Sequence, residues 1–372
     1  MSDIAVIFGG PSPEHDVSVL TGLQAAHELQ RAGHAVQALY WSKSAEWFAV
    51  DAALEASAFL DGVPKGAQGL RLVLGAGGGF APSGGGRFSK QKSTEFEVAV
   101  VCCHGGPGED GTLQAALDGA GIPYTGPGVA AAALGMDKLA FGGLMVAAGI
   151  ATLPRRALTA TTDAVGFDGP YILKPRFGGS SIGIHVVEDL ATARDLLGGE
   201  HLRAGAVLEP FRPDLFDVQV ALRCWPALQV SAIERPLRSA VGGTRGEILG
   251  YIDKYVGGEG MASAPRELPA ALTDALADEV RRVARHIGDL ALVRGVARID
   301  FLTNGDELLV NEINTIPGSL ARYLWIDPVV PFATLLADMI AEATARPTFF
   351  YSASGADGLV LRGASSIAAK LA

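Results

Sequence analysis

The sequence predicts an α/β protein with more than one domain, and three observations support this. The chain opens with a strand-like run, Ile4 to Phe8, followed by a glycine turn and a helical pattern that ends near Gly33. A second apolar run, Glu97 to Cys103, is typical of a buried parallel strand and also ends in a glycine-rich loop. The length of 372 residues exceeds one ordinary core. We therefore expect a doubly wound α/β unit at the start, with ligands at the carboxyl ends of its strands.

Composition excludes several classes of protein. Hydrophobic residues make up 49% of the chain and charged residues 19%, which is a globular composition. The net charge of −10 argues against nonspecific binding of nucleic acid or anionic membrane. The longest uncharged window, Gly119 to Met136, contains prolines and glycines that no clean membrane span would carry. The three cysteines have neither disulfide nor zinc spacing, and no signal peptide opens the chain, so a cytoplasmic protein is expected.

The first half continues with a strand at Ala35 to Trp41 and a weakly patterned stretch from Ala52 to Lys92, which we expect to be a mobile surface loop. His104 follows the buried strand and is flanked by glycines. A histidine there can be structural or functional, and its strand-end position keeps a functional role open. Helices are expected from Thr112 and from Met136 to about Ala148.

The second half contains a strand, Tyr171 to Pro175, that carries Lys174 and leads into a Gly/Ser-rich loop at 176–183. Such a loop can close over phosphates with N–H groups and hydroxyls, or it can be an ordinary connection; it is not a strand-to-helix P-loop. The glycine-punctuated segment 235–265 is either disordered or an active-site lid. The other expected elements are strands at 206–211 and 216–222 and helices at 268–290 and 328–345.

A β-hairpin is expected between these last two helices. Its strands, 295–302 and 307–313, flank the turn signal Asn304-Gly-Asp. Residues two apart in a strand share a face, so Arg298 lies beside Asp300, and Glu312 beside Asn314. Two carboxylates and an amide oxygen next to an arginine suit Mg²⁺ with its phosphates, although the same pattern fits a salt-bridged hairpin edge.

Taken in order, these motifs make the chain resemble the D-alanine–D-alanine ligase branch of the ATP-grasp superfamily, over roughly residues 3–345. The resemblance rests on seven stretches that occur in collinear order: Gly9-Gly-Pro-Ser-Pro-Glu-His-Asp-Val-Ser18, His104-Gly-Gly-Pro-Gly-Glu-Asp-Gly-Thr-Leu-Gln114, Tyr124-Thr-Gly-Pro-Gly-Val129, Met136-Asp-Lys-Leu139, Lys174-Pro175 with Gly179-Ser-Ser-Ile-Gly183, Lys254-Tyr255, and the hairpin with its continuation to Gly318.

The resemblance implies a three-domain ATP-grasp fold with an N-terminal doubly wound domain. The implied domains are an N-terminal substrate domain at 1–135, a central subdomain at 136–221, a C-terminal subdomain at 222–346 with its lid at 235–265, and an extension at 347–372. The implied reaction uses ATP to activate one amino acid as an acyl phosphate, which the amine of a second amino acid attacks. The products are a dipeptide for peptidoglycan, ADP and phosphate. Two Mg²⁺ ions, replaceable by Mn²⁺, and a homodimer are also implied.

The resemblance further implies roles for individual residues. The expected ATP-binding residues are Lys138, Lys174, Ser180, Ser181, Glu209, Asp217 and Lys254, with Glu209 on the adenine amino group and Asp217 on the ribose. The expected metal ligands are Asp300, Glu312 and Asn314. Arg298 and the N–H of Gly318 would stabilise the oxyanion of the tetrahedral intermediate. Glu14, supported by Ser180 and Tyr255, would bind the ammonium group of the first substrate, and His104 would lie near its carboxylate.

The chain departs from the family pattern after Gly318, where Tyr323 occupies the position of an expected serine that binds the acceptor. Arg322, Tyr323 and Leu324 are therefore the expected acceptor residues, and either D-alanine in a repacked pocket or a different acceptor is compatible with them. Tyr255 favours amide over ester formation, unless it only packs on its loop. A regulatory relative without activity is a third hypothesis, against which the complete set of lysines and metal ligands argues. A dehydrogenase is excluded, because no Gly-x-Gly-x-x-Gly follows the first strand.

Overall fold

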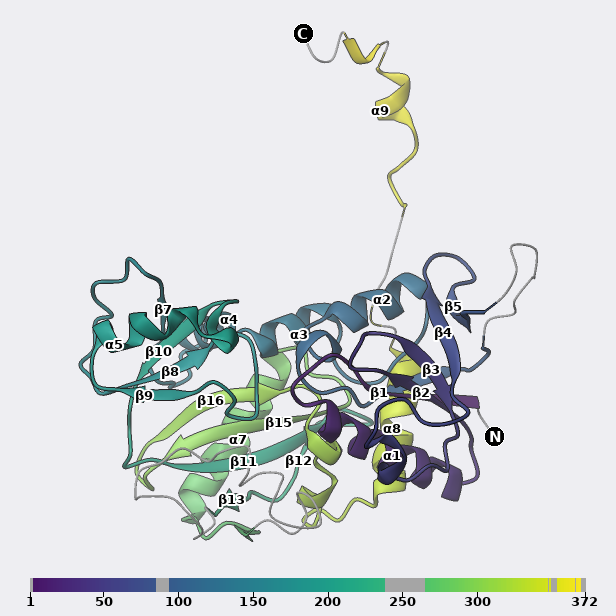
Figure 1. The fold of residues 1–372 in the computed structure, drawn as a ribbon. Helices are drawn as coiled ribbons and strands as arrows, with labels where there is room; N and C mark the ends of the chain where they lie inside the picture. The colour runs from purple at the N-terminus through teal and green to yellow at the C-terminus, as the bar shows by residue number, and fades with distance from the viewer. Residues whose placement is uncertain are drawn as a thin grey trace.

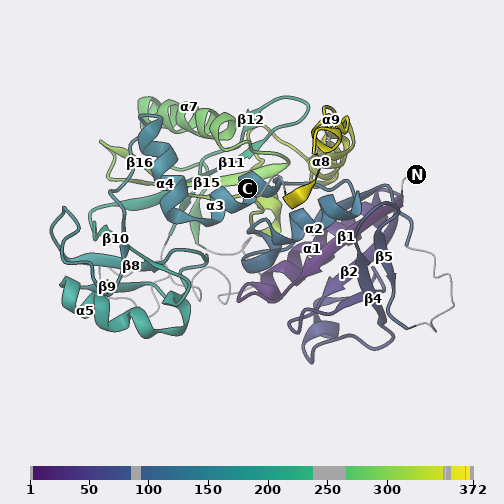
Figure 2. The same ribbon diagram turned by 90° about the horizontal axis from the view of Figure 1, so that it is seen from above.

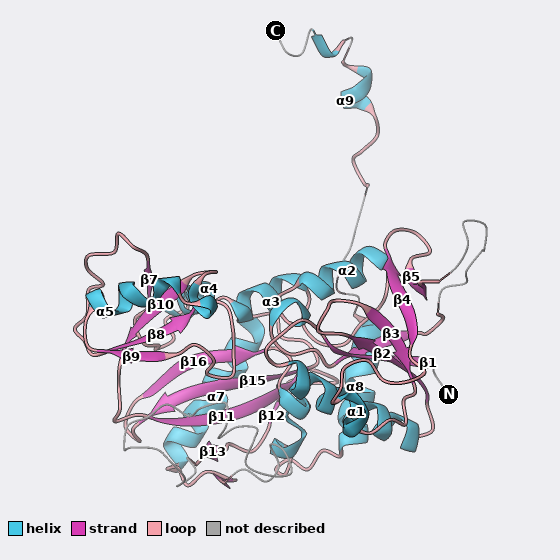
Figure 3. Cartoon of the chain, in the orientation of Figure 1, coloured by secondary structure: helices cyan, strands magenta, loops and turns pink. Residues whose placement is uncertain are grey.

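The computed structural model describes residues 3–84, 94–237, 265–346, 348, 353–364 and 366–368. This part of the chain forms a six-stranded sheet, two four-stranded sheets and a two-stranded ribbon, with helices packed against them (Figure 1, Figure 3). The expected α/β class is confirmed. None of the helices in the described ranges is both long and apolar enough to cross a membrane.

The N-terminal sheet has the order β5-β4-β3-β2-β1-β6. Its strands are β1 (Asp3–Gly9), β2 (Ala35–Trp41), β3 (Trp47–Val50), β4 (Gln68–Val73), β5 (Gly79–Pro82) and β6 (Val98–Val101). β1 pairs in parallel with β2 and β6, as the doubly wound pattern predicts. β3, β4 and β5 form an antiparallel extension of the edge; β4 and β5 lie in the stretch where we expected a loop, and β3 was not predicted. These edge strands are short and partly exposed, so they lack the buried apolar run that marks β1 and β6.

Helices α1 (His15–Arg31), α2 (Thr112–Ala120) and α8 (Phe332–Ala345) belong to the N-terminal unit. α1 ends as predicted, with Gly33 in the left-handed region at φ +89°. Gly22 allows α1 to approach the sheet closely, because a Cβ there would lie 2.3 Å from the Cβ of Phe8. α8 comes from the far end of the chain, yet its apolar face is part of the same core as β1 and α1 (Figure 1). A helix that follows the third sheet in the sequence therefore completes the core of the N-terminal unit.

The central unit is an antiparallel sheet in the order β7-β10-β8-β9. It consists of β7 (Arg156–Leu158), β8 (Tyr171–Pro175), β9 (His185–Val187) and β10 (Ala206–Pro210), with the short helix α5 (Leu190–Asp195). Helices α3 (Val129–Met136) and α4 (Lys138–Ala147) lead into it from the N-terminal unit (Figure 2). Asp137 caps α4 by accepting from the N–H groups of Leu139 and Ala140, which places Lys138 in its first turn.

The third sheet has the order β12-β11-β15-β16 and carries α7 (Asp274–Leu290). Its strands are β11 (Phe216–Arg223), β12 (Gln229–Val230), β15 (Val296–Thr303) and β16 (Leu308–Asn314); β13 (Arg235–Pro236) and β14 (Arg266–Glu267) form the ribbon. The expected hairpin is confirmed as β15 and β16. Its turn is fixed by the side chain of Asn304, which accepts from the N–H groups of Asp306 and Glu307. The expected domain boundary after residue 221 lies inside β11, a strand of this sheet.

Helices α3 and α5 and strand β7 were not among the expected elements, and the expected helix at 268–290 differs in its limits. α7 begins six residues after the expected Leu268, because Thr273 caps its first turn by accepting from Leu276 N–H. The C-terminal segment contains the single-turn helix α9 (Leu359–Arg362), which Figure 1 shows away from the rest of the molecule.

Candidate active site

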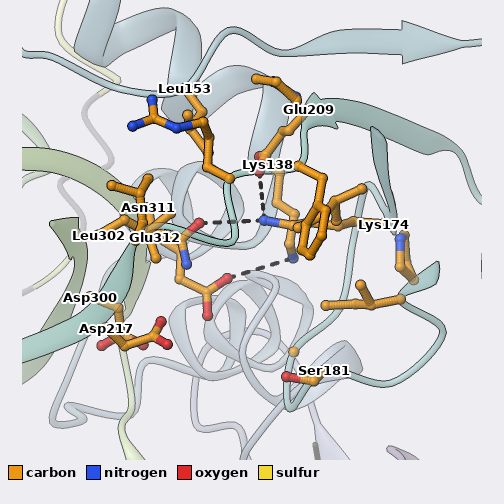
Figure 4. Close-up of a pocket in the computed structure, with 18 of the residues that line it drawn as sticks. Lys138, Leu153, Lys174, Ser181, Glu209, Asp217, Asp300, Leu302, Asn311 and Glu312 are labelled. Carbon is orange, nitrogen blue, oxygen red and sulfur yellow. Dashed lines mark hydrogen bonds and ion pairs between the residues drawn. The ribbon is translucent and has the colours of Figure 1, made fainter. Parts of the chain in front are cut away.

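A cavity lies between the central sheet and the third sheet (Figure 4). Seven of the residues selected from the sequence line it: Lys138, Lys174, Ser181, Glu209, Asp217, Asp300 and Glu312. Leucine, isoleucine and phenylalanine side chains complete its wall, from Leu153, Ile172, Phe211, Leu215 and Leu302. The cavity therefore combines an apolar surface for a flat ring with cationic and anionic groups for phosphates and metal.

The two lysines reach this cavity from two different secondary-structure elements. Lys174, on β8, donates from Nζ to Glu209 Oε2 over 2.6 Å and to Asn311 Oδ1 over 3.4 Å (Figure 4). Lys138, at the start of α4, donates from Nζ to the carbonyl oxygen of Gly178 and lies 4.0 Å from Glu312 Oε2. Burial lowers the pKa of Lys138, with Glu312 opposing this effect and Lys174 adding to it. Two positive charges thus face one cavity.

Glu209 is fully buried, and each of its carboxylate oxygens has a cationic partner. Oε1 accepts from Arg155 Nε over 2.7 Å, and Oε2 from Lys174 Nζ. Burial would raise the pKa of Glu209, but Lys174 and Arg155 outweigh it and lower the pKa to about 2. In this structure the carboxylate of Glu209, which we expect to bind the adenine amino group, therefore holds Lys174 in place.

Arg155 was not selected from the sequence. It also donates to the carbonyl oxygens of Lys138, over 3.1 Å, and of Asn311, so it ties α4 and β16 to β10. It stands next to Arg156, which is exposed, and the local pattern carries no signal that one of the two arginines would be buried.

The hairpin places the expected metal ligands together. Asp300 is in register with Glu312, and Arg298 with Asn314. Arg298 binds both carboxylate oxygens of Asp300, over 2.7 and 2.8 Å, and Asn314 Nδ2 lies 3.2 Å from Asp300 Oδ2. Among the described residues there is no cluster of three or more His, Cys, Asp or Glu side chains suited to a metal. A Mg²⁺ site here needs the amide of Asn314 as its third side chain, and these hard oxygen donors, facing two lysines across the cavity, fit that ion.

The Gly/Ser-rich loop separates this cavity from a second one. Pro175, Gly178, Gly179 and Ile182 line both cavities, and the second one is also lined by Glu14, Ser12 and Gly105. Ser180 donates its hydroxyl proton to Glu14 Oε1, a contact that the family resemblance implies. A Cβ at Gly105 would lie 2.5 Å from Glu14 Oε2, and one at Gly179 would lie 3.0 Å from it. Glycine at both positions leaves room for the carboxylate between the loop and the N-terminal unit.

His104 is buried, and both of its ring nitrogens have protein partners. Nδ1 lies 2.7 Å from the carbonyl oxygen of Ile316, and Nε2 lies 2.8 Å from Thr21 Oγ1. Burial lowers the pKa of His104 to about 4; the bond to Ile316 opposes this effect and nearby Arg298 adds to it. In this structure the neutral ring is thus held by protein groups on both sides, and its place near the substrate carboxylate stays a prediction.

The residues after Gly318 form a left-handed turn. Ser319, Leu320 and Ala321 have φ values of 50°, 49° and 48°. For residues with a Cβ this conformation costs about 1–2 kcal/mol each, so contacts elsewhere must maintain it. Nothing in the sequence indicates this turn, because none of the three residues is glycine or asparagine.

The three expected acceptor residues lie in different environments. The Tyr323 hydroxyl is buried without a hydrogen-bond partner among the described residues, and the Arg266 guanidinium lies 4.7 Å from its ring centroid. Arg322 is exposed and packs over the ring of Phe332. Leu324 is fully buried in the N-terminal core, so its side chain does not face the site. Tyr323 lies within electrostatic range of Arg298 and Asp300, whose charges act on the pKa of its hydroxyl. Lys254 and Tyr255 fall outside the described residues.

Comparison with known proteins identifies relatives over nearly the whole chain. The family models described as "D-ala D-ala ligase N-terminus" and "D-ala D-ala ligase C-terminus" match residues 3–127 and 132–341. A D-alanine–D-alanine ligase from Mycobacterium sp. (strain KMS) is 32% identical, covering 93% of this chain and 97% of the relative. The enzyme of that name from Mycobacterium tuberculosis (strain CDC 1551 / Oshkosh) is also 32% identical, over 92% of this chain and 95% of the relative.

Solved structures share the fold. The D-alanine-D-alanine ligase from Coxiella burnetii superimposes with a TM-score of 0.73 at 22% identity, covering 93% of this chain and 94% of that one. The VanG D-Ala:D-Ser ligase from Enterococcus faecalis superimposes with a TM-score of 0.71 at 23% identity, covering 92% and 99%.

Proposed function

The chain belongs to the D-ala D-ala ligase family, and from that premise we propose that it is an ATP-dependent ligase that joins two D-alanine molecules for peptidoglycan. The observation that carries this proposal is the cavity in which Lys138 and Lys174 face the hairpin residues Asp300 and Glu312. A polyphosphate, its metal ions and a reacting carboxylate need this combination of charges.

ATP would occupy the cavity with its adenine against the apolar wall and its phosphates between the lysines. Lys138 and Lys174 offset the negative charge, and they can follow it during transfer because an ammonium group is a point charge with rotatable donors. Ser181 and the neighbouring N–H groups of the Gly/Ser-rich loop would cover the phosphates from the side of the central sheet. Asp217, which lines the same cavity, would bind the ribose hydroxyls.

Asp300, Glu312 and Asn314 are the residues that would hold Mg²⁺, two ions by resemblance to the family. When bound, the metal neutralises charge on the phosphates and polarises them for transfer. The chain's own contribution is the hairpin register, which brings the two carboxylates opposite each other. The carboxylate of Asp300, which Arg298 binds in this structure, would then be shared between Arg298 and the ion.

The second cavity suits the first amino acid. Glu14 lines it, and its carboxylate, positioned by the Ser180 hydroxyl, would bind the ammonium group of the substrate. The substrate carboxylate would then point past the loop toward the phosphates. Its oxygen would attack the γ-phosphorus and ADP would leave, which produces an acyl phosphate. The amine of the second D-alanine would attack the acyl carbon, and the C–O bond to phosphate would break.

Arg298 and the N–H of Gly318 would stabilise the negative oxygen formed during that attack. Arg298 is buried and held in one orientation by Asp300, so little reorganisation is needed when the charge develops. Removal of one donor of this type typically costs about 3–4 kcal/mol of transition-state stabilisation.

The test is ADP release and dipeptide formation from D-alanine, ATP and Mg²⁺, with L-alanine as the control. We expect D-alanyl-D-alanine as the product. If no amino acid, alone or in pairs, produced an ATP- and Mg²⁺-dependent product, the proposal would fail and the nucleotide-binding regulatory hypothesis would replace it.

Tyr323 favours a second candidate, a ligase of the same mechanism with another acceptor. Its ring is larger than the serine expected there, and it lies beside Arg266 and the buried carboxylate of Glu234, to which Arg266 donates over 3.0 Å. A panel of D- and L-amino acids separates the candidates. Turnover with a mixed pair but not with D-alanine alone would favour the second.

A homodimer in the cytoplasm completes the proposal. The resemblance to the family supports the dimer, and the supply of ATP supports the compartment. Light scattering of the purified chain tests the assembly, and a monomer at micromolar concentration would contradict it.

A further inference from the structure

The backbone of residues 316–319, which carries Gly318, is held by side chains of the N-terminal unit. The carbonyl oxygen of Ile316 lies 2.7 Å from His104 Nδ1, and the N–H of Ile316 donates to Glu109 Oε1 over 3.0 Å. On the other side of Gly318, the N–H of Ser319 donates to Thr21 Oγ1 over 3.0 Å. The proposed oxyanion donor therefore lies between two anchor points that belong to a different domain.

Thr21 and His104 connect these anchor points directly, because Thr21 Oγ1 lies 2.8 Å from His104 Nε2. Burial keeps the His104 ring neutral near pH 7, since its pKa is lowered to about 4. A neutral ring has one donor and one acceptor, and the Ile316 carbonyl can only accept, so Nδ1 carries the proton and Nε2 accepts. The Thr21 hydroxyl must then donate to Nε2 while its oxygen accepts from Ser319.

The only competing acceptor for the Thr21 proton among the described residues is the Val17 carbonyl oxygen, 3.0 Å away within α1. That oxygen lies one helical turn back, where the helix supplies its own N–H partner, whereas a buried Nε2 without a donor would remain unpaired. The result is a chain of three hydrogen bonds that runs from Ser319 N–H through Thr21 and His104 to the Ile316 carbonyl. The backbone from Ile316 to Ser319 joins its two ends and closes a ring. We refer to these four residues as the Thr21–His104 ring.

The ring also explains how the left-handed turn that follows is maintained. Ser319 is its first residue, and Thr21 accepts a hydrogen bond from the N–H of this residue. Leu320 and Ala321 are fully buried in the N-terminal core, which fixes the rest of the turn. The strained backbone beside Gly318 is thus held by the same unit that would bind the first substrate.

We infer that Thr21 is a positioning residue for the ligation step: with His104 it holds residues 316–319 so that the Gly318 N–H points at the developing oxyanion. This inference rests on the proposed function of Gly318. Thr21 is 1% exposed, so it acts through the backbone that it binds and not through contact with a substrate.

The test compares Thr21→Val, which keeps the shape of the side chain and removes the hydroxyl, with Thr21→Ser, which retains it. We expect Thr21→Val to lower kcat about 10- to 100-fold, the range associated with a displaced oxyanion donor, while KM for ATP changes less than about twofold. Thr21→Ser should recover most of the rate. Thr344→Val is the matched control, because the Thr344 hydroxyl makes the same contact to a carbonyl one turn back, over 3.0 Å, on the exposed face of α8.

A second measurement needs no turnover. Amide hydrogen exchange should be at least about tenfold faster at Ser319 in Thr21→Val than in the wild type, and unchanged in Thr344→Val. Equal exchange at Ser319, or an unchanged kcat, would overturn the inference. If the wild type formed no dipeptide, the proposed function would fail, while Ser319 exchange would still show whether the ring exists.

His104→Asn tests the ring from its other side if Thr21→Val does not fold. Asparagine can still donate to the Ile316 carbonyl but offers Thr21 no acceptor at Nε2. We expect His104→Asn to lower kcat. The double variant His104→Asn with Thr21→Ala should be no slower than the slower of the two single variants. Losses that simply multiply would show that the two residues act independently and would contradict the ring.

Discussion

The buried carboxylate of Glu209 provides the sharpest test of how the nucleotide site is built. The variant Glu209→Gln keeps the size of the side chain but removes the charge that two cations share. Arg155 and Lys174 would then lie buried beside a neutral amide. Its oxygen could accept from one of the two cations, but its NH2 group would face the other cation, which is also a donor.

The expected loss of stability follows from the pKa of Glu209. Its fall from the ordinary 4.5 to about 2 corresponds to about 3 kcal/mol, at about 1.4 kcal/mol for each tenfold change in proton affinity. Breaking a buried ion pair by removing one partner costs about 3–5 kcal/mol, which agrees. Because the folded-state pKa is depressed, this stabilisation is complete above pH 4.5 and is lost as the pH falls toward 2. The difference between wild type and variant should therefore be largest near neutral pH and smaller at pH 3.

Urea unfolding followed by circular dichroism at pH 7 and pH 3 measures the effect. Asp214→Asn is the control, because the exposed pair between Asp214 and Arg212, at 2.6 Å, is worth less than about 1 kcal/mol. A Glu209→Gln variant within about 0.5 kcal/mol of the wild type at pH 7 would refute the assignment of Glu209 as the anchor of Lys174.

Nucleotide binding by the same variant separates two roles for Glu209. If the carboxylate holds Lys174, Glu209→Gln should weaken the binding of ATP and the binding of its analogue without the 6-amino group by the same factor. If the carboxylate binds the adenine amino group, only the affinity for ATP should fall. Since both oxygens already accept from cations, we expect equal factors, measured by calorimetry with a non-hydrolysable triphosphate.

Three further variants test a metal ligand, the oxyanion donor Arg298 and a buried carboxylate of the N-terminal unit. Glu312→Gln should lower ADP release at least about 100-fold while the melting temperature changes little, because it removes a metal ligand that is only partly buried; near-normal turnover would contradict the metal assignment. Arg298→Lys cannot bind both oxygens of Asp300, so kcat should fall about 100-fold with KM for ATP nearly unchanged, and a purely raised KM would show a binding role instead. Burial, with the charge of Glu14, raises the pKa of Glu109 to about 7, so the contribution of Glu109 to stability is complete below pH 4.5 and is lost as the pH rises through 7. Glu109→Gln should remove this contribution, about 3 kcal/mol, from the pH dependence of the unfolding free energy. The same pH dependence in the variant and the wild type would contradict the raised pKa.

The hairpin from Arg298 to Asn314 shows how far local pattern carries a prediction. Alternation predicted the strands of this hairpin, and Asn304-Gly-Asp predicted its turn. Asp300 lies opposite Glu312 only because Asn311 is an extra residue that shifts the register of β16, and the sequence does not indicate this β-bulge. The loop at Ser180 was also found from its composition. The edge strands β3 to β5 were missed, because short, partly exposed strands carry little apolar signal.

Residues defined by a distant partner could not be found in this way. Arg155 matters because it meets Glu209, and Leu324 was selected for the acceptor by its place in a motif, although its side chain packs in the N-terminal core. Neither partner is visible from the neighbouring residues, since each contact joins separate elements.

The sequence by itself was enough to predict the α/β class, the β-hairpin and the family, and to propose which residues bind phosphate and metal. Those features depend on spacing within a few residues, where backbone geometry alone decides which side chains share a face. Only the tertiary structure decided which charges are buried together and what holds the backbone around Gly318. Thr21 and Ser319 are 298 positions apart, and the bond between them forms only after the first and last parts of the chain have packed around one core.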